Sequence, residues 1–144
     1  MNQAQKRAVN YVRTLNDVVD KTQETQKKLN KQFEVIKKAM NDGTLKDMKS
    51  ADYLSIQGEF QSGTDEYAKL ADRLSNAKAP AKLFGINLSL VQSYRDYVKS
   101  CQAMIDSMKD DRTVDKAAFE QSENDQDVAS AEMTKHILKM NSLY

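Results

Sequence analysis

The sequence predicts an all-α protein, an antiparallel up-down four-helix bundle with a long first helix. Three observations carry this prediction. The 144 residues include only four glycines and one proline, so residues that break helices are rare. Hydrophobic residues recur at steps of three and four along four separate segments. The breaks between these segments are short, and short connectors join helices that lie antiparallel. We expect a single domain over residues 1–144, with helices at about 3–41, 51–77, 81–109 and 115–143.

The first predicted helix carries the longest apolar stripe. From Ala8 to Met40 its positions alternate steps of four and three, a heptad pattern typical of packed helices. Gly43 favours a left-handed C-terminal cap. Thr22 and Gln26 place polar groups on the stripe, where a polar layer commonly fixes helix register. Because this helix exceeds the others by about ten residues, we expect an overhang that projects or pairs with a second copy in a homodimer.

The second stripe, from Tyr53 to Ala77, contains Gly58 and Gly63. Each glycine weakens a helix by about 1 kcal/mol relative to alanine. Gly63 lies on the stripe itself, so it indicates either the close approach of a neighbouring helix or, as a functional interpretation, a kink or a ligand groove. Thr44 and Ser50 precede this helix as candidate caps.

Breaks in the chain also delimit the third and fourth helices. Pro80 cannot continue a helix but suits the first turn of the next one. The stripe from Phe84 to Met108 is flanked by a second apolar row, so we expect this helix to be the most buried. Thr113 or Asp115 can cap the fourth helix. The first half of that helix is nearly polar, and we expect it to pack loosely.

The net charge of +1 is the sum of two opposed segments. Residues 1–41 carry nine basic and four acidic side chains, whereas residues 110–132 carry two basic and eight acidic ones. In an up-down bundle the end of the first helix and the start of the fourth meet, so we expect the basic run from Lys27 to Lys38 to pair internally. The alternative is a basic interaction stripe with Lys27, Lys28 and Lys31. The balanced charge argues against a protein that coats nucleic acid.

Few residues carry chemistry. His136, the only histidine, lies near Met140 on the last stripe. With Met40, Met104 or Met108 on another helix it could ligate haem, but no C-x-x-C-H sequence is present. Cys101, the only cysteine, is typical of a small buried hydrophobe, and a nucleophilic role would need His136 as its base. No phosphate-binding loop or Glu-x-x-His pair exists. We therefore expect no enzyme and no cofactor.

Two stretches resemble a known group of proteins. The sequences APAKLF (79–84) and VQSYRDYV (91–98) are similar to small helical lipoproteins of Gram-positive bacteria, in which a Pro-led helix with spaced Tyr and Leu follows a long Lys/Gln/Asn-rich helix. The resemblance covers residues 79–108 and implies an exported domain tethered outside the cell, of unassigned function. Cys101 lies mid-chain and is not a lipid-attachment cysteine. The protein is then extracytoplasmic and lipid-tethered if its signal has been removed, and cytoplasmic otherwise.

These observations favour a non-enzymatic bundle that acts through its surface. A protein or peptide partner is expected on the overhang of the first helix or on a groove between Gly58 and Gly63. The alternative is a ligand or cofactor carrier with a cavity near His136, Cys101, Met104 and Met140. No run of about 18 apolar residues exists, so the sequence predicts no transmembrane segment.

Overall fold

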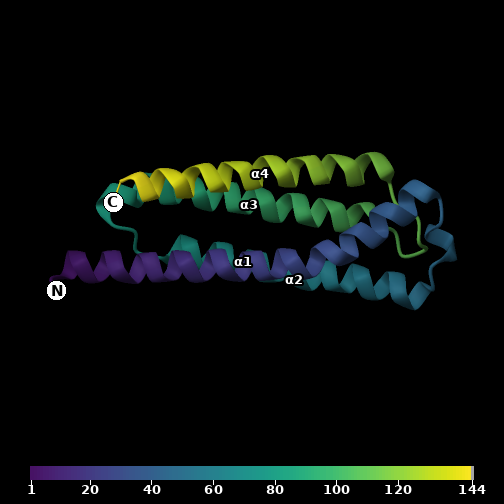
Figure 1. Ribbon diagram of the computed structural model, residues 1–144, viewed down its shortest axis with the longest axis horizontal. Coiled ribbons are helices and arrows are strands. Elements are labelled where there is room, and N and C mark those ends of the chain that lie inside the picture. The colour runs from purple at the N-terminus through teal and green to yellow at the C-terminus, as the bar shows by residue number, and fades with distance from the viewer. Residues whose placement is uncertain (144) are drawn as a thin grey trace.

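The computed structural model describes residues 1–143 as four antiparallel helices (Figure 1). They are α1 (Gln3–Asp42), α2 (Ser50–Asn76), α3 (Phe84–Ser107) and α4 (Lys116–Ser142), with short 3-10 turns at Leu45–Asp47 and Ala81–Leu83. Within the described residues no strand forms, and one isolated β-bridge joins Met108 and Val114. The prediction of an all-α four-helix bundle with a long first helix is confirmed.

The helices form two layers, with α1 beside α2 and α3 beside α4 (Figure 1). Both ends of the described chain and the connection from α2 to α3 lie at one end of the bundle. We call this end the terminal pole and assign to it residues 1–15, 76–92 and 134–143. The other two connections, at 43–49 and 108–115, form the connection pole. The backbones of α3 and α4 approach closely along their length, whereas those of α1 and α4 stay further apart. The open side of the bundle therefore lies between α1 and α4.

The residues that flank α1 and α4 explain where these helices begin and end. Asn2 and Gln5 form a reciprocal capping box, in which each side chain accepts the other residue's backbone N–H, at 2.8 and 3.0 Å. Gly43 has a φ of 71°, the left-handed cap that the sequence predicts. Asp115 accepts the N–H of Ala118 at 3.1 Å and caps α4 as expected.

The predicted caps before α2 are wrong. Ser50 is already the first residue of the helix, and no side chain caps it. Thr44 precedes the 3-10 turn, also without a side-chain cap. The segment before α2 is fixed from elsewhere, because Arg112, in the connection between α3 and α4, donates to the carbonyls of Lys46 at 3.0 Å and Met48 at 2.7 Å. Local sequence signals do not reveal this bonding, because its partners are 66 and 64 residues apart along the chain.

The extra length of α1 does not project from the connection pole. In Figure 1 the last turns of α1 rise from their own layer toward α3 and α4. Ile36 is fully buried and Ala39 is buried. Ile36 belongs to the same apolar cluster as Tyr53 of α2 and Phe119 of α4. The expected projecting overhang is thus wrong at this end, because its apolar stripe is covered by the protein's own helices. A homodimer through α1 stays a prediction.

The core contains two apolar clusters with polar contacts between them. The cluster toward the terminal pole includes Tyr11, Leu15, Leu70, Leu74, Leu90 and Met140. The cluster toward the connection pole includes Ile36, Tyr53, Phe60, Met104, Ile105 and Phe119. Between them the hydroxyls of Thr22 and Tyr94 lie 2.6 Å apart, and Gln26 Nε2 donates to Tyr97 Oη at 3.0 Å. The polar positions on the stripe of α1 therefore bond to α3, as expected of a layer that fixes register.

The first half of α4 packs tightly, and the expectation of loose packing is wrong. Phe119 is 0% exposed and Ser122 is 2% exposed. The Ser122 hydroxyl donates to the Phe119 carbonyl at 2.7 Å, so this polar group is satisfied within its own helix. Small buried residues recur at every seventh position, which lets two helices approach closely. They are Ser93, Ser100 and Ser107 on α3 and Ser122 and Ala129 on α4. We call these five residues the small-residue seam.

Candidate functional site

A cavity lies at mid-height of the bundle, beneath the open side between α1 and α4. Its volume is about 250 Å³, slightly below the range of about 300–1,000 Å³ typical of pockets for drug-sized ligands. All four helices line it. Its mainly apolar wall includes Phe33, Phe60, Tyr67, Tyr97, Cys101 and Met104. Its polar rim consists of Gln26, Asn30, Glu123, Gln126, Asp127 and Ser130. We call this space the mid-bundle cavity.

Two tyrosines, Tyr67 and Tyr97, line the side of the cavity toward the terminal pole, and a third, Tyr94, packs against Tyr97. The rings of Tyr67 and Tyr97 meet edge to face, with centroids 5.2 Å apart and an interplanar angle of 69°. Tyr94 meets Tyr97 in the same manner, at 6.3 Å and 74°. Such edge-to-face pairs are favourable for aromatic rings and hold them in fixed positions. Together with the bond from Gln26 to Tyr97, they give the cavity a rigid aromatic wall with a polar contact at its edge.

Burial keeps the ionisable groups of this wall protonated. It raises the pKa of Tyr97 to about 12 and the pKa values of Tyr67 and Tyr94 well above their usual range. Burial also raises the pKa of the Cys101 thiol to about 12, because a thiolate would lose its hydration there. At neutral pH the aromatic wall and the thiol are therefore uncharged.

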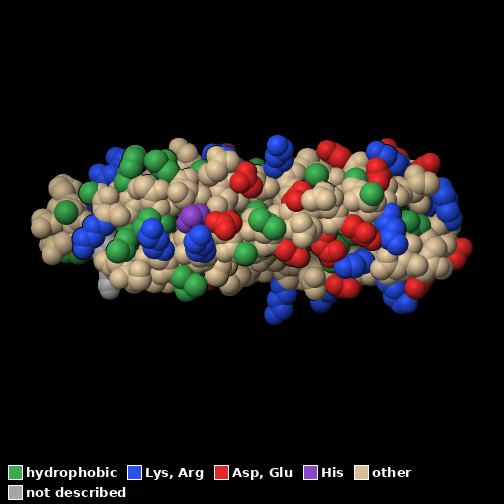
Figure 2. All heavy atoms as spheres, turned by 90° about the horizontal axis from the view of Figure 1, so that it is seen from above, with side chains coloured by type: hydrophobic (Ala, Val, Ile, Leu, Met, Phe, Trp, Pro, Cys, Tyr) green, Lys and Arg blue, Asp and Glu red, His purple; other side chains and the backbone are tan. Residues whose placement is uncertain are grey.

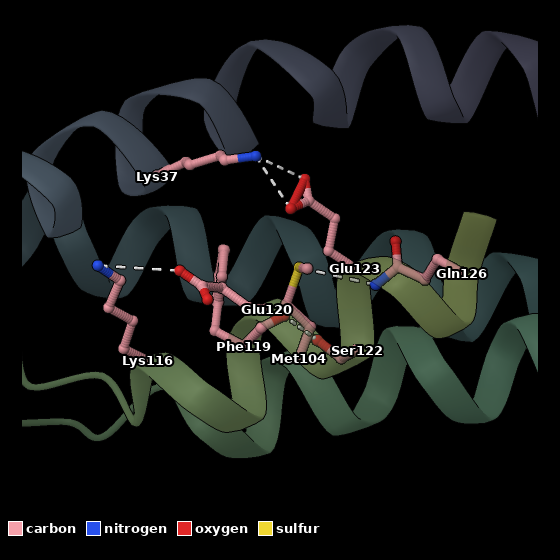
Figure 3. A network of polar contacts seen from close by, with 8 residues as sticks. All are labelled: Lys37, Met104, Lys116, Phe119, Glu120, Ser122, Glu123 and Gln126. Atoms are coloured by element: carbon pink, nitrogen blue, oxygen red, sulfur yellow. Dashed lines mark hydrogen bonds and ion pairs between the residues drawn. The ribbon is translucent and has the colours of Figure 1, made fainter. Parts of the chain in front are cut away.

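The end of the cavity toward the connection pole is bridged by an ion pair. Lys37 of α1 reaches Glu123 of α4, and its Nζ lies 2.9 Å from both carboxylate oxygens (Figure 3). The hydrogen bond to Glu123 raises the pKa of Lys37. Below this pair, Phe33 stacks on Phe119 with ring centroids 5.7 Å apart. Gln126 Nε2 lies 3.7 Å from the sulfur of Met104 across the cavity (Figure 3).

The structure brings together only some of the residues that the sequence singles out as ligand candidates. Cys101 and Met104 line the mid-bundle cavity. His136 and Met140 do not, since His136 lies 3.9 Å from Glu132 on the same helix and Met140 accepts the Tyr11 hydroxyl in the cluster toward the terminal pole. Met104 belongs to the other cluster, so the haem interpretation loses its pair of axial ligands. Among residues 1–143 no group of three or more His, Cys, Asp or Glu side chains could hold a metal ion.

The candidates for an interaction surface are also only partly assembled. Lys28, Lys31 and Gly63 line a shallow depression between α1 and α2, together with acidic residues such as Glu66. Lys27 and Gly58 are not part of its lining. A basic stripe does not form there, because carboxylates share the depression. A partner on this face stays a prediction.

Gly63 marks a close approach of two helices. A Cβ atom at this position would lie 2.5 Å from Leu29 Cδ1 of α1, whereas one at Gly58 would meet nothing within 4 Å. The packing interpretation of Gly63 is thus confirmed, and the groove expected between the two glycines is covered by Leu29 at one end.

The predicted internal charge pairing is confirmed for one lysine only. Lys37 pairs with Glu123, but Lys38 pairs with Asp42 of its own helix at 2.7 Å. Lys27, Lys28 and Lys31 form no ion pair with the described residues. The acidic segment is opposite only the last turns of α1, because α1 and α4 diverge away from the connection pole.

Sequence analysis missed the residues that give the cavity its polar rim and aromatic wall. Gln26 and Gln126 both lie on apolar stripes, and the antiparallel arrangement puts them at the same height. Two polar residues that replace apolar ones at the same level of the bundle indicate a gap in the core. Tyr67 and Tyr97 offered no such signal, because tyrosine on a stripe is equally common in closed cores.

The architecture thus defines the protein as an all-α four-helix bundle with an open cavity lined by all four helices. Comparison with protein-family models, with curated proteins and with solved structures finds no match to this chain. None of the described helices combines the length and the apolar character needed to cross a membrane.

The burial of Cys101 predicts a slow reaction with alkylating agents. Iodoacetamide attacks the thiolate, and at about pH 8 the folded protein holds this thiol almost fully protonated and 8% exposed. We expect alkylation at least about 100-fold slower in the folded protein than in urea, followed by mass spectrometry. Equal rates in the two conditions would show that the thiol is open to solvent.

Proposed function

We propose that the protein is a non-enzymatic binding bundle that holds a small ligand in the mid-bundle cavity. The observation that carries this proposal is the cavity itself, which lies where two packed clusters would otherwise join into one core. The cavity opens between α1 and α4, and its walls come from both apolar clusters. A space of about 250 Å³ with aromatic walls and several convergent polar groups is therefore typical of a binding site.

The lining indicates the chemical class of the ligand. Aromatic rings and the Met104 thioether favour an apolar, preferably aromatic, body. Asp127 on the rim forms no ion pair with the described residues, and the lining contains no Lys, Arg or His. An anion would be repelled by Asp127, and the nearest cation described at the cavity, Lys37, is already paired with Glu123. The ligand is accordingly a neutral or cationic molecule with a hydrogen-bonding head at the rim and an aromatic body inside.

A binding role without catalysis fits the groups that surround the ligand. Nucleophilic chemistry at Cys101 needs a base that removes its proton, and no histidine lines the cavity. The raised pKa of the thiol further lowers its thiolate fraction. The side chains that line the cavity can bind a ligand by shape complementarity, aromatic stacking and hydrogen bonds.

Three probes that differ in charge test this proposal. Phenethylamine is a cation, 2-phenylacetamide is neutral and phenylacetate is an anion, while their aromatic bodies are alike. We expect the first two to shift the methyl signal of Met104 in a protein labelled at methionine methyl groups, with a Kd of about 1 mM for molecules of this size. Phenylacetate should bind at least about tenfold more weakly.

A cavity-filling variant supplies the control. Ser130→Phe places a ring at the rim and should abolish binding of phenethylamine. Ser55→Phe puts the same ring on an exposed position of α2 outside the cavity lining and should leave binding unchanged. Failure of all three probes to bind saturably, or equal binding by the Ser130→Phe and Ser55→Phe variants, would overturn the proposal.

A further inference from the structure

The terminal pole has a charge composition unlike the rest of the protein. Its three segments contain seven basic residues and no Asp or Glu, so all 21 acidic residues of the chain lie elsewhere. The seven are Lys6, Arg7, Arg13, Lys78, Lys82, Lys135 and Lys139. At the left end of the face drawn in Figure 2, basic and hydrophobic side chains are visible and acidic ones are not. A net charge near zero for the whole chain therefore hides one strongly basic end.

Hydrogen bonds hold the segments of this pole in fixed positions. Arg7 Nε donates to the carbonyl of Ala79 at 3.0 Å and so joins the start of α1 to the connection between α2 and α3. The Tyr11 hydroxyl donates to Asn87 Oδ1 at 2.5 Å, and Asn87 Nδ2 donates to the Leu74 carbonyl at 3.2 Å. These bonds join α1 to the connection that carries Lys78 and Lys82. The contact of the Tyr11 hydroxyl with the Met140 sulfur at 3.7 Å joins α1 to α4, which carries Lys135 and Lys139.

Exposed apolar side chains are concentrated at the same pole. Of the ten large hydrophobic residues that are exposed in the described chain, seven lie in the terminal pole. They are Met1, Val9, Val12, Phe84, Leu88, Leu138 and Leu143. Phe84 and Leu88 are 57% and 58% exposed and lie one turn apart on α3. Solvent-exposed phenylalanine and leucine beside a basic surface are typical of an interaction site.

We propose that the terminal pole binds end-on to an anionic lipid surface. Phosphate and carboxylate headgroups would contact the basic side chains, while Phe84, Leu88 and Leu138 enter the boundary of the acyl chains. The placement of the apolar residues favours a bilayer over a protein partner. They are spread over α1, α3 and α4, and of the seven only Phe84 lines the groove between the start of α1 and the connection from α2 to α3, whereas a protein partner is generally received by a continuous apolar patch or groove. A bilayer accommodates scattered apolar side chains, and its negative charge complements a surface without carboxylates.

Vesicle sedimentation tests the proposal with the full chain. We expect the protein to sediment with vesicles of phosphatidylcholine and phosphatidylserine mixed at about two to one, and to remain in solution with phosphatidylcholine alone. Because each basic residue near an anionic bilayer strengthens binding about fivefold, the Lys78→Glu/Lys139→Glu variant should lower the partition coefficient at least 20-fold or so. The Phe84→Ser/Leu88→Ser variant should lower it at least about tenfold.

Two matched variants distinguish binding through the terminal pole from nonspecific binding to vesicles. Lys28→Glu/Lys31→Glu changes the charge by the same amount, but these lysines lie more than about 30 Å from the start of α1, well beyond the screening length. Val35→Ser/Leu54→Ser removes exposed apolar residues that lie outside the terminal pole. Both should bind vesicles within about threefold of the original protein. Circular dichroism confirms that each variant is folded.

Three results would overturn the proposal. Equal partitioning into neutral and anionic vesicles would remove the electrostatic argument. Equal losses in the pole variants and their matched controls would remove the assignment to this pole. Binding to polyglutamate without binding to anionic vesicles would assign the surface to an acidic protein partner.

Discussion

Raising the pH from about 9 to about 12 is expected to unfold the protein in one cooperative transition. The cause is the set of phenols that the fold buries. All five tyrosines among residues 1–143 are buried. Burial raises the pKa of Tyr11, Tyr53 and Tyr97 to about 12, and those of Tyr67 and Tyr94 rise above their usual range for the same reason. In the unfolded chain these groups lose their protons near pH 10.

The direction of this effect follows from proton binding. Above about pH 10 the unfolded state has released phenolic protons that the folded state still holds, so the unfolded state binds fewer protons and the free energy of unfolding falls as the pH rises. Each buried tyrosine contributes about 1.4 kcal/mol per pH unit until its folded pKa is reached. Five such groups lower the stability by about 7 kcal/mol per unit, enough to cancel a typical total of about 5–15 kcal/mol within two units.

Two signals recorded together check this expectation. The absorbance of tyrosinate should rise in the same transition in which the helical circular dichroism is lost. Tyr67→Phe keeps the ring and removes one titrating group, so its transition should be less steep and should move to higher pH. A gradual rise of tyrosinate near pH 10 with intact helices would instead show that the phenols are open to solvent.

Substituting Phe119 by alanine is expected to lower the free energy of unfolding by about 3–5 kcal/mol. Its ring has no exposed surface, stacks on Phe33 of α1 and belongs to the cluster that also holds Ile36. Removal leaves a cavity that the rigid seam between α3 and α4 cannot close. Urea denaturation followed by circular dichroism gives the free energy of unfolding from the midpoint and slope.

Phe84 provides the matched control for this substitution. It is 57% exposed, so Phe84→Ala should change the free energy of unfolding by no more than about 0.5 kcal/mol. The two substitutions remove the same ring, one from the core and one from the surface. A loss below about 1 kcal/mol in Phe119→Ala would mean that the first half of α4 packs loosely after all, as its polar sequence suggests.

The helices could be predicted from the sequence because their signals are local. The heptad steps of α1 and the glycine at position 43 give its extent, and Pro80 and Asp115 mark the next boundaries within a few residues. The segment before α2 could not be predicted, because no side chain caps the helix and Arg112 fixes that segment from the connection between α3 and α4. The tight packing of α4 was missed for a similar reason. Serines on a stripe look polar in the sequence, whereas Ser122 satisfies its hydroxyl within the helix and allows α3 to come close.

The mid-bundle cavity was predictable only in part. Thr22 and Gln26 indicate a polar layer, and the structure gives them partners on α3. The position of the cavity depends on how far α1 and α4 diverge. The sequence of one helix does not predict this distance. The sequence therefore groups Cys101 and Met104 with His136, although His136 lies in the terminal pole and not at the cavity.

The basic character of the terminal pole becomes visible only when charges are grouped by their position in the folded bundle. Summed over the first helix, basic and acidic residues suggest a partner for the run from Lys27 to Lys38. When the charges are instead grouped by their position along the bundle axis, one end contains no Asp or Glu. The rest of the bundle contains all the acidic residues. The second grouping requires the direction of every helix, and the up-down topology supplies it.

The small-residue seam determines the route by which a ligand can reach the mid-bundle cavity. Parting α3 from α4 would open close backbone packing along their whole length. On the other side, the contacts between α1 and α4 around the cavity include the Lys37–Glu123 pair and the stack of Phe33 on Phe119, and a partly exposed ion pair contributes only about 0–1 kcal/mol. A ligand would therefore enter between α1 and α4, where less backbone packing has to be parted, while the side between α3 and α4 stays closed.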